Sequence, residues 1–315
     1  MPAIEDLLVC TACGTQFSVD ASSKKSSCRI CDDPRQFVPP SGQKFTTLRD
    51  MKGIYQNKWM QDEFDERIWS IWTEPKASIH RSLQFAIGQR CLLLRTPHGN
   101  ILWDLITYLD EPTINWINSL GGLTAILISH PHYYTTHAYW ASTFGCPVYT
   151  HSEDSFWLEP VTRFPSPVAN ADCRLIKGAT EEIVRGVTGV RCGGHFDGSL
   201  VCHWQDAKSL FIADTLVTAP SALNPHTESS TPAPGTGRNS YSFLWSIPNM
   251  IPLPPTAIQK IWEALRPFEF EQTYGAFVGT DVRDKQCKER VLESMKIVVR
   301  GMGWHDVQIL TENMP

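Results

Sequence analysis

The sequence predicts an α/β protein with a small cysteine-bearing module at its N-terminus. Short β-rich runs broken by Gly, Pro and Asn are typical of consecutive strands and hairpins. Segments of helical character lie between these runs, and alternating strands and helices indicate an α/β fold. Two Cys-x-x-Cys pairs close to the N-terminus predict the separate module.

The elements of the main body follow one another in a clear order. We expect strands in the segments 64–75, 83–105, 123–132, 146–151, 181–194, 199–204 and 209–216. Helices are expected in the segments 111–122, 135–145, 254–267 and 284–300. Gly145 and the glycine pair at 121–122 are helix-ending signals, and Pro255 suits a first helical turn. The tail 304–315 offers a last strand or an irregular end.

The sequence predicts a chain of two parts. Residues 1–48 are predicted to form the cysteine module, and residues 49–315 the α/β domain. Within that domain, the segment 224–240 is rich in Ser, Thr, Pro and Gly, which predicts a loop. A lid over a site and a surface insertion are both open interpretations of this loop.

Composition and charge exclude several classes of function. The 315 residues are 42% apolar and 19% charged with a formal charge of −5, and the only basic cluster is the thin "SSKKSS". We therefore expect no electrostatic binding of nucleic acid. The N-terminus lacks a signal-peptide pattern, and no run reaches the roughly 18 apolar residues of a membrane span, so a cytoplasmic location is expected.

The ten cysteines form two populations. The scattered six, mostly inside apolar runs, are expected to be reduced and buried, with an oxidised framework as the alternative. They are Cys91, Cys146, Cys173, Cys192, Cys202 and Cys287. The other four are the two Cys-x-x-Cys pairs, Cys10, Cys13, Cys28 and Cys31.

The two cysteine pairs predict a metal site. Each pair supplies two sulfurs from one tight turn, and two such turns give the tetrahedral four-sulfur site that Zn²⁺ prefers. A module of this size buries little core, so the metal would supply its folding energy. Iron in the same ligand set and a redox dithiol are the alternatives. A closed four-thiolate zinc site indicates a structural element, or a surface that binds a protein partner.

Histidines cluster at the end of the predicted strand 123–132. In "ISHPHYYTTH", His130 and His132 alternate along an extended segment, so both side chains can face one ion. Neutral imidazoles suit zinc, and a third histidine from a distant loop would leave one coordination position open. His195 in "GGHFDGSL" fits that third place, and Asp214 ends the strand "SLFIAD".

These motifs resemble the metallo-β-lactamase superfamily. "SHPH", "GGHFDGSL" and "FIADTL" occur in the family's order and approximate spacing, and "NILWDL" falls where the family has a strand ending in aspartate. The resemblance covers roughly residues 65–300. It implies a four-layered αβ/βα sandwich of two mixed β-sheets flanked by helices, with a metal site at one edge. It also implies His130, His132 and His195 as metal ligands and Asp214 as the carboxylate ligand.

The sequence departs from the family where a second metal would bind. The pattern His-x-His-x-Asp-His would place aspartate at Tyr134 and histidine at Thr135, and the last family histidine is missing from the segment 273–279. A single ion is therefore expected, with Asp214 as a ligand or as a neighbour of the ligands. His137 is the only local candidate for a replacement, either as a ligand in a two-metal site or as a hydrogen-bonding residue.

The resemblance implies a metal-dependent hydrolase that uses a metal-activated water on a small molecule. Ester, thioester and lactone substrates suit one metal better than phosphodiesters do, and the active-site ion would be Zn²⁺ or Fe²⁺. Two alternatives remain open at this point. One is a non-haem iron oxidoreductase of the same fold, and the other is a non-catalytic binding protein that kept the fold.

Overall fold

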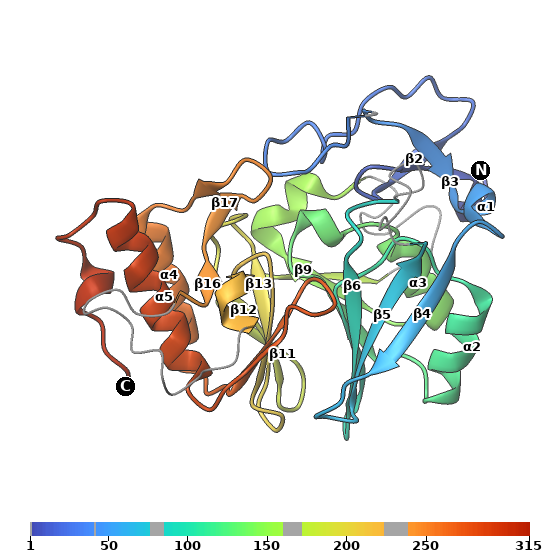
Figure 1. Ribbon diagram of the computed structural model, residues 1–315. Coiled ribbons are helices and arrows are strands. Elements are labelled where there is room, and N and C mark those ends of the chain that lie inside the picture. The colour runs from blue at the N-terminus through green and yellow to red at the C-terminus, as the bar shows by residue number, and fades with distance from the viewer. Residues whose placement is uncertain (1, 41, 76–84, 160–171, 224–238) are drawn as a thin grey trace. The chain divides into compact units, whose positions relative to one another are not determined.

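The computed structural model describes residues 2–40, 42–75, 85–159, 172–223 and 239–315 (Figure 1). The chain divides into two compact units, Met1–Lys177 and Gly178–Pro315. The cysteine module is part of the first unit, and the domain boundary expected at residue 48 stays a prediction. Most of the loop expected at 224–240 lies outside the described residues.

The cysteine module forms a small antiparallel sheet at the start of the first unit. Its order is β2 (Gln16–Asp20), β1 (Leu7–Cys10) and β3 (Phe45–Thr47), followed by the short helix α1 (Leu48–Met51). The buried core of the module contains the four cysteines together with Ala12, Phe17 and Ile30. Four of these seven side chains are thiols, so apolar burial alone gives this module little stability.

The first unit is built on a seven-stranded mixed sheet. In spatial order the strands are β10 (Cys173–Ile176), β9 (Val148–His151), β8 (Ala125–Leu127), β7 (Gly99–Trp103), β6 (Arg90–Thr96), β5 (Ile68–Glu74) and β4 (Gln56–Gln61). The pairs from β4 to β7 are antiparallel, and those from β7 to β10 are parallel. Parallel strands end at the same edge of a sheet, so the loops after β7, β8 and β9 gather there.

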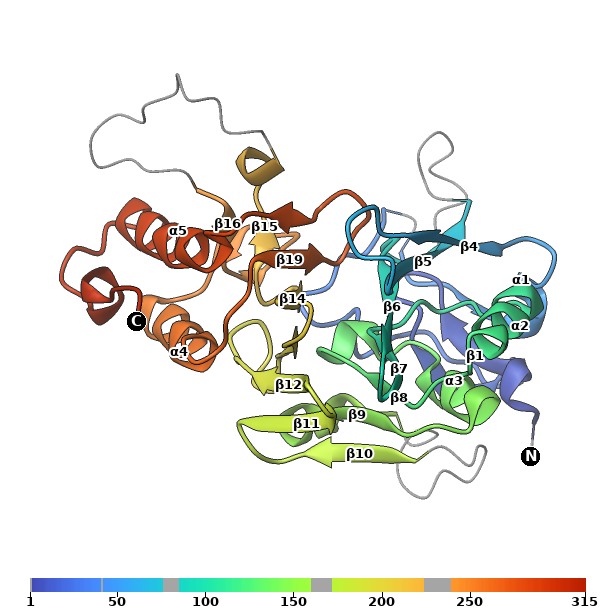
Figure 2. The same ribbon diagram turned by 90° about the horizontal axis from the view of Figure 1, so that it is seen from below.

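Helices α2 (Glu111–Ser119) and α3 (His137–Phe144) lie on one side of this sheet (Figure 2). Trp116 of α2 stacks on Trp59 of β4 with ring centroids 4.7 Å apart. Helix α3 ends at Gly145, whose φ of 63° is the left-handed conformation that glycine adopts without strain. Both helices therefore begin and end close to where the sequence predicted.

The second unit is built on a six-stranded mixed sheet. Its order is β11 (Thr180–Val184), β12 (Val187–Arg191), β13 (Leu200–Trp204), β14 (Ser209–Ala213), β19 (Gln272–Gly275) and β20 (Val282–Arg283). Two small antiparallel sheets are formed by β15 (Val217–Thr218) with β16 (Tyr241–Ser242), and by β17 (Leu244–Ser246) with β18 (Ile251–Pro252). The pair β14–β19 is parallel, and the other pairs of the six-stranded sheet are antiparallel.

Helices α4 (Pro255–Leu265) and α5 (Cys287–Gly301) lie on one side of this second sheet (Figure 2). Their apolar faces enter one buried cluster with strand residues such as Val201 and Leu210. The tail contributes a short 3₁₀ turn, Gln308–Thr311, so the last strand considered for 304–315 is wrong. Ile309 of this turn is buried in the same cluster, which explains why the segment does not extend a sheet.

The six scattered cysteines are free and buried, as predicted. Burial raises the pKa of Cys146 and of Cys173 to about 12, so these thiols stay protonated and unreactive at neutral pH. In the described part of the chain, no helix is long and apolar enough to span a bilayer.

The N-terminus of α2 gives a first testable prediction. Asp110 caps the helix: its Oδ1 accepts from the Thr113 N–H at 3.0 Å, and its Oδ2 accepts from the Asn57 N–H at 2.7 Å. Asp110→Ala should lower the free energy of unfolding by about 1–2 kcal/mol, because both N–H groups lose their acceptor. Urea unfolding measures the loss. Glu111→Ala, at the exposed neighbouring position, should change stability by less than about 0.5 kcal/mol; equal effects would contradict the capping role.

Candidate metal centre

The four cysteines of the module converge on one point. Their sulfur atoms all lie within 4.8 Å of one another, with Cys10 Sγ 3.7 Å from Cys31 Sγ and Cys13 Sγ 3.6 Å from Cys28 Sγ. Four sulfurs in a tetrahedron at about 2.3 Å from a zinc ion are about 3.8 Å apart. The spacing therefore fits a four-thiolate metal site.

The ionisation of these thiols also favours a cation. The pKa of Cys10 is lowered because the Cys13, Cys28 and Cys31 thiols donate hydrogen bonds to its sulfur. The pKa of Cys13 is raised because burial removes its thiol from water. The cluster alone therefore favours one thiolate among thiols, and a divalent cation would allow all four sulfurs to ionise.

The second candidate centre begins where β8 ends. His130 and His132 are buried, and their ring centroids lie 4.9 Å apart at an interplanar angle of 68°. Ser129 Oγ lies 2.9 Å from His130 Nδ1, so that ring nitrogen has a hydrogen-bond partner. The Ser129 N–H donates to Asp104 Oδ1 at 2.7 Å. The first unit thus holds two histidines in fixed positions at the carboxyl edge of its sheet.

Asp104 ends β7 in a left-handed conformation with φ of 57°, and its own N–H donates to the Leu127 carbonyl at 2.9 Å. Asp104 is buried, and its backbone N–H and its carboxylate both form hydrogen bonds that join the end of β7 to the end of β8. The sequence signal was a strand ending in aspartate. The role of Ser129 had no sequence signal, since a serine beside a histidine is common.

His195 and Asp214 lie together in the second unit. His195 follows Gly193 and Gly194, with φ of 69° and 86°, and a Cβ on Gly194 would lie 2.9 Å from Leu253 Cδ1. His195 Nδ1 lies 3.2 Å from the Leu244 carbonyl oxygen. Because a carbonyl only accepts, Nδ1 carries the proton and Nε2 keeps the lone pair that a metal requires.

The carboxylate of Asp214 faces that lone pair. Asp214 follows Ala213, whose φ of 43° turns the chain at the end of β14. Asp214 Oδ2 is 3.9 Å from His195 Nε2, and both side chains are buried. This distance is too long for a hydrogen bond, and it exceeds by about 0.5 Å the roughly 3.4 Å between two ligands of a tetrahedral zinc ion, so a small shift brings both to one ion. The pair therefore fits a shared cation.

The positions of the family's second-metal ligands hold neither a histidine nor a carboxylate. Tyr134 is buried, and its hydroxyl donates to the Asp154 carbonyl at 3.2 Å and accepts from Thr150 Oγ1 at 3.2 Å. Thr135 is buried with a φ of 37°. In the segment 273–279, which also lacks a histidine, β19 ends at Gly275 and the half-exposed Phe277 follows.

His137 takes the hydrogen-bonding alternative. It begins α3, and its Nδ1 lies 2.7 Å from the Tyr134 carbonyl oxygen. Within the described residues its Nε2 is buried without a hydrogen-bond partner, and it forms no ligand group with His130 and His132. Burial lowers the pKa of His137 to about 4, so the ring is neutral under ordinary conditions.

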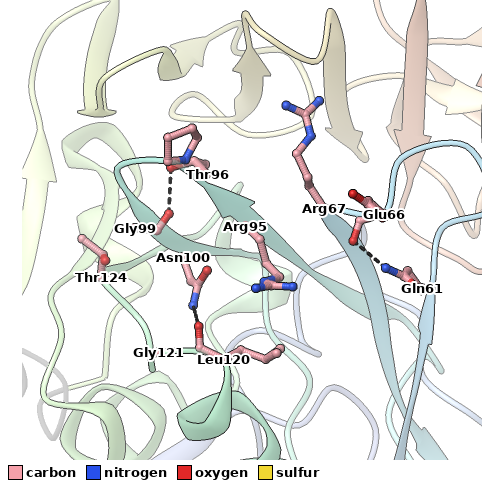
Figure 3. Close-up of a pocket in the computed structure, with 11 residues that line it drawn as sticks. Gln61, Glu66, Arg67, Arg95, Thr96, Gly99, Asn100, Leu120, Gly121 and Thr124 are labelled. Carbon is pink, nitrogen blue, oxygen red and sulfur yellow. Dashed lines mark hydrogen bonds between the residues drawn. The ribbon is translucent and has the colours of Figure 1, made fainter.

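A cavity of about 620 Å³ lies elsewhere in the first unit (Figure 3). It is lined by Gly99 and Asn100 at the start of β7, by Thr124 just before β8, and by Arg67 and Arg95. Gly99, Asn100 and Thr124 lie at the amino ends of β7 and β8, whereas the histidines follow the carboxyl end of β8. This cavity is therefore not the histidine centre.

Comparison with known proteins now decides the family. The profile of the metallo-beta-lactamase superfamily matches residues 87–268, more than half of the chain. The chain belongs to the metallo-beta-lactamase superfamily. It is also 36% identical over 293 residues to "Uncharacterized protein YmaE" of Bacillus subtilis (strain 168), covering 91% of this chain and 92% of that protein.

Some solved structures resemble the chain distantly. The metallo-beta-lactamase FIM-1 from Pseudomonas aeruginosa, in its mono-zinc form, is 12% identical with a TM-score of 0.48, over 77% of this chain and 96% of that one. A structure titled "Peroxy diiron species of chemotaxis sensor ODP" is 14% identical with a TM-score of 0.47, over 76% and 94%. The predicted α/β fold of the superfamily, with two mixed sheets, flanking helices and an N-terminal four-cysteine cluster, is confirmed.

The buried neutral His137 gives a prediction about acid stability. An unfolded chain protonates this histidine near pH 6.5, but the folded chain does so only near pH 4. The folded state therefore loses stability as the pH falls from about 6.5 towards 4, by about 2 kcal/mol between pH 7.5 and 5. His137→Asn keeps a donor for the Tyr134 carbonyl and removes the titration. Urea unfolding at both pH values should show a smaller acid loss in the variant by about that amount, and equal losses would contradict it.

Proposed function

We propose that this protein is a metal-dependent hydrolase in which His130, His132 and His195 bind one ion. Asp214 would be a further ligand or a hydrogen-bond acceptor beside the ion. The observation that carries the proposal is the pair formed by His195 and Asp214. The His195 Nε2 atom lies 3.9 Å from a carboxylate oxygen of Asp214, while its Nδ1 atom is hydrogen-bonded to the Leu244 carbonyl. A buried histidine whose role was only structural would need no such arrangement.

The donor set supports a borderline cation. Neutral imidazoles and one carboxylate suit Zn²⁺ or Fe²⁺ better than Mg²⁺ or Ca²⁺, which prefer oxygen ligands. When bound, such an ion lowers the pKa of a water to about 7 and polarises a carbonyl group. The chain's own residues hold the rings: Ser129 contacts His130 Nδ1, and the Leu244 carbonyl accepts from His195 Nδ1. Fixed rings lose little conformational entropy when a cation binds.

One ion rather than two is supported by the positions of Tyr134 and Thr135. The Tyr134 hydroxyl is engaged with Asp154 and Thr150 inside the first unit, and burial raises its pKa well above the ordinary value. A phenol that stays protonated is a poor metal ligand. With no histidine in 273–279, the three ligands expected around a second ion are replaced or missing.

A one-metal centre favours esters, thioesters and lactones of small molecules. Their carbonyl carbon is attacked directly and needs charge stabilisation at a single oxygen. Phosphodiester cleavage places developing charge on both the attacking and the leaving oxygens, which two-metal sites stabilise. We therefore propose small carbonyl substrates for this protein.

For the cysteine module we propose structural zinc. The sulfur spacing of 3.6–3.7 Å fits a tetrahedral ion, and a closed four-thiolate set leaves no position for a substrate. A protein partner for the outer surface of the module stays a prediction from the sequence.

Metal content tests the proposal. Elemental analysis should find two metals per chain in the wild type and one in His132→Ala, because the four-thiolate ion remains and the histidine centre loses a ligand. His98→Ala, which removes an exposed histidine of the same unit, should keep both metals. Three metals in the wild type would contradict the one-ion centre.

Activity assays distinguish the hydrolase from the two alternatives, an oxidoreductase and a non-catalytic binding protein. An aryl ester, an acyl thioester and a γ-lactone should be hydrolysed by the wild type and by His98→Ala, with kcat/KM lowered at least about 100-fold in His132→Ala. Stoichiometric iron with oxygen consumption would replace the hydrolase by an oxidoreductase. If cells that carry His130→Ala or His195→Ala keep every phenotype of the wild type, whereas Cys10→Ala abolishes it, the protein is a non-catalytic binding protein.

A further inference from the structure

The cysteine module touches the chain segment that carries the histidines. We call residues 128–137 the histidine loop and residues 10–16 the cysteine turn. The Gln16 N–H, at the end of the cysteine turn, donates to the Thr135 carbonyl at 3.1 Å. Thr135 lies between His132 and His137. A backbone hydrogen bond from the module therefore fixes the histidine loop close to His130 and His132, the proposed metal ligands.

The backbone of Thr135 is strained and needs contacts that stabilise it. Its φ of 37° is unusual for a β-branched residue and costs on the order of 1–3 kcal/mol. Its hydroxyl is buried and has no hydrogen-bond partner among the described residues. A conformation of this kind persists only where the surroundings fix it, and the Gln16 N–H is one part of those surroundings.

Thr107 makes a second connection between the module and the histidine loop. Its carbonyl accepts from Thr136 Oγ1 at 2.6 Å, on the loop side. On the module side, a Cβ added to Gly14 would lie 1.8 Å from Thr107 Oγ1. Gly14, Thr107 and Thr136 therefore pack in series, and only glycine at position 14 lets the cysteine turn approach this closely.

The shape of the cysteine turn depends on its sulfurs. The Gly14 N–H donates to the Cys10 carbonyl at 2.8 Å, and the Cys10 N–H donates to the Thr15 carbonyl at 2.9 Å. Cys13 Sγ lies 3.2 Å from Thr15 Oγ1. Since four of the seven core side chains of the module are the cysteines, an ion bound by them would add order to the turn that carries Gly14 and Gln16.

We propose that the four-cysteine site positions the histidine loop, with Gly14 and Gln16 as the positioning residues. This inference rests on the proposed metal-binding role of His130 and His132. Order in the cysteine turn fixes Thr135 and Thr136, and these fix the loop between the two histidine ligands and α3. Binding of the ion at the cysteines therefore strengthens binding of the ion at the histidines.

Cobalt titration of the full chain tests the coupling. Co²⁺ bound by four thiolates absorbs through sulfur-to-metal charge transfer, whereas Co²⁺ bound by histidines does not, so the two sites are followed separately. Gly14→Ala should keep the thiolate band and weaken Co²⁺ binding at the histidines about 10–100-fold, the usual effect of disturbing the surroundings of a ligand. Hydrogen exchange of the segment 128–137 should become faster.

Matched variants separate the contact from backbone strain. Gly53 has the same φ of 82° as Gly14, but nothing lies within 4 Å of its added Cβ, so Gly53→Ala should leave histidine-site affinity within about twofold. Thr107→Ala combined with Gly14→Ala removes the clashing hydroxyl and should restore most of the affinity. If Gly14→Ala changes the thiolate band itself, Thr107→Leu is the second variant. It enlarges the side chain that contacts Gly14 from outside the module, and it should weaken Co²⁺ binding only at the histidines.

The outcomes distinguish the two proposals. An unchanged histidine-site affinity in Gly14→Ala, or in Thr107→Leu where the first variant loses its thiolate band, would overturn the coupling and leave the hydrolase standing. Coupled cobalt binding with no hydrolysis of the three substrates would support the coupling and overturn the hydrolase. A wild type that binds cobalt only through thiolates would overturn both.

Discussion

The carboxylate of Asp104 is the contact on which the histidine centre of the first unit depends. Placed at the end of β7, it accepts the Ser129 N–H and so fixes the point at which β8 passes into the histidine loop. Ser129 in turn contacts His130 Nδ1. One buried carboxylate therefore determines both the path of the backbone and the orientation of the first ring. An anion in this position also stabilises positive charge nearby, which favours a cation at the histidines.

Beyond His132 the histidine loop is held by hydrogen bonds and packing within the first unit. Tyr134 fills a buried position and bonds to the Asp154 carbonyl, while the Thr135 backbone accepts from Gln16. These contacts come from inside the unit, and they give this stretch one ordered path that does not depend on ligand bonds to a second ion.

The sequence predicted the helices and strands well because their signals are local. Gly145 ended α3 as expected, and the short β-rich runs broken by Gly, Pro and Asn located most strands of both sheets. The motif residues could be named because each follows a strand end. The partners of those residues could not be predicted, since the Leu244 carbonyl beside His195 and the Gln16 N–H beside Thr135 are backbone groups far away in the chain. Nearly every residue has a backbone donor and acceptor, so the amino-acid sequence does not indicate which of them form these contacts.

The position of the cysteine module has a thermodynamic consequence for the histidines. The strained Thr135 backbone costs free energy, and a group that stabilises this conformation lowers the cost of keeping the histidine loop in it. The Gln16 N–H is such a group, and its place depends on the four sulfurs. Linkage is reciprocal, so an ion at the histidines would also favour order in the cysteine turn. Under the proposed coupling, an ion at the cysteines and an ion at the histidines would stabilise one another through the same few backbone contacts.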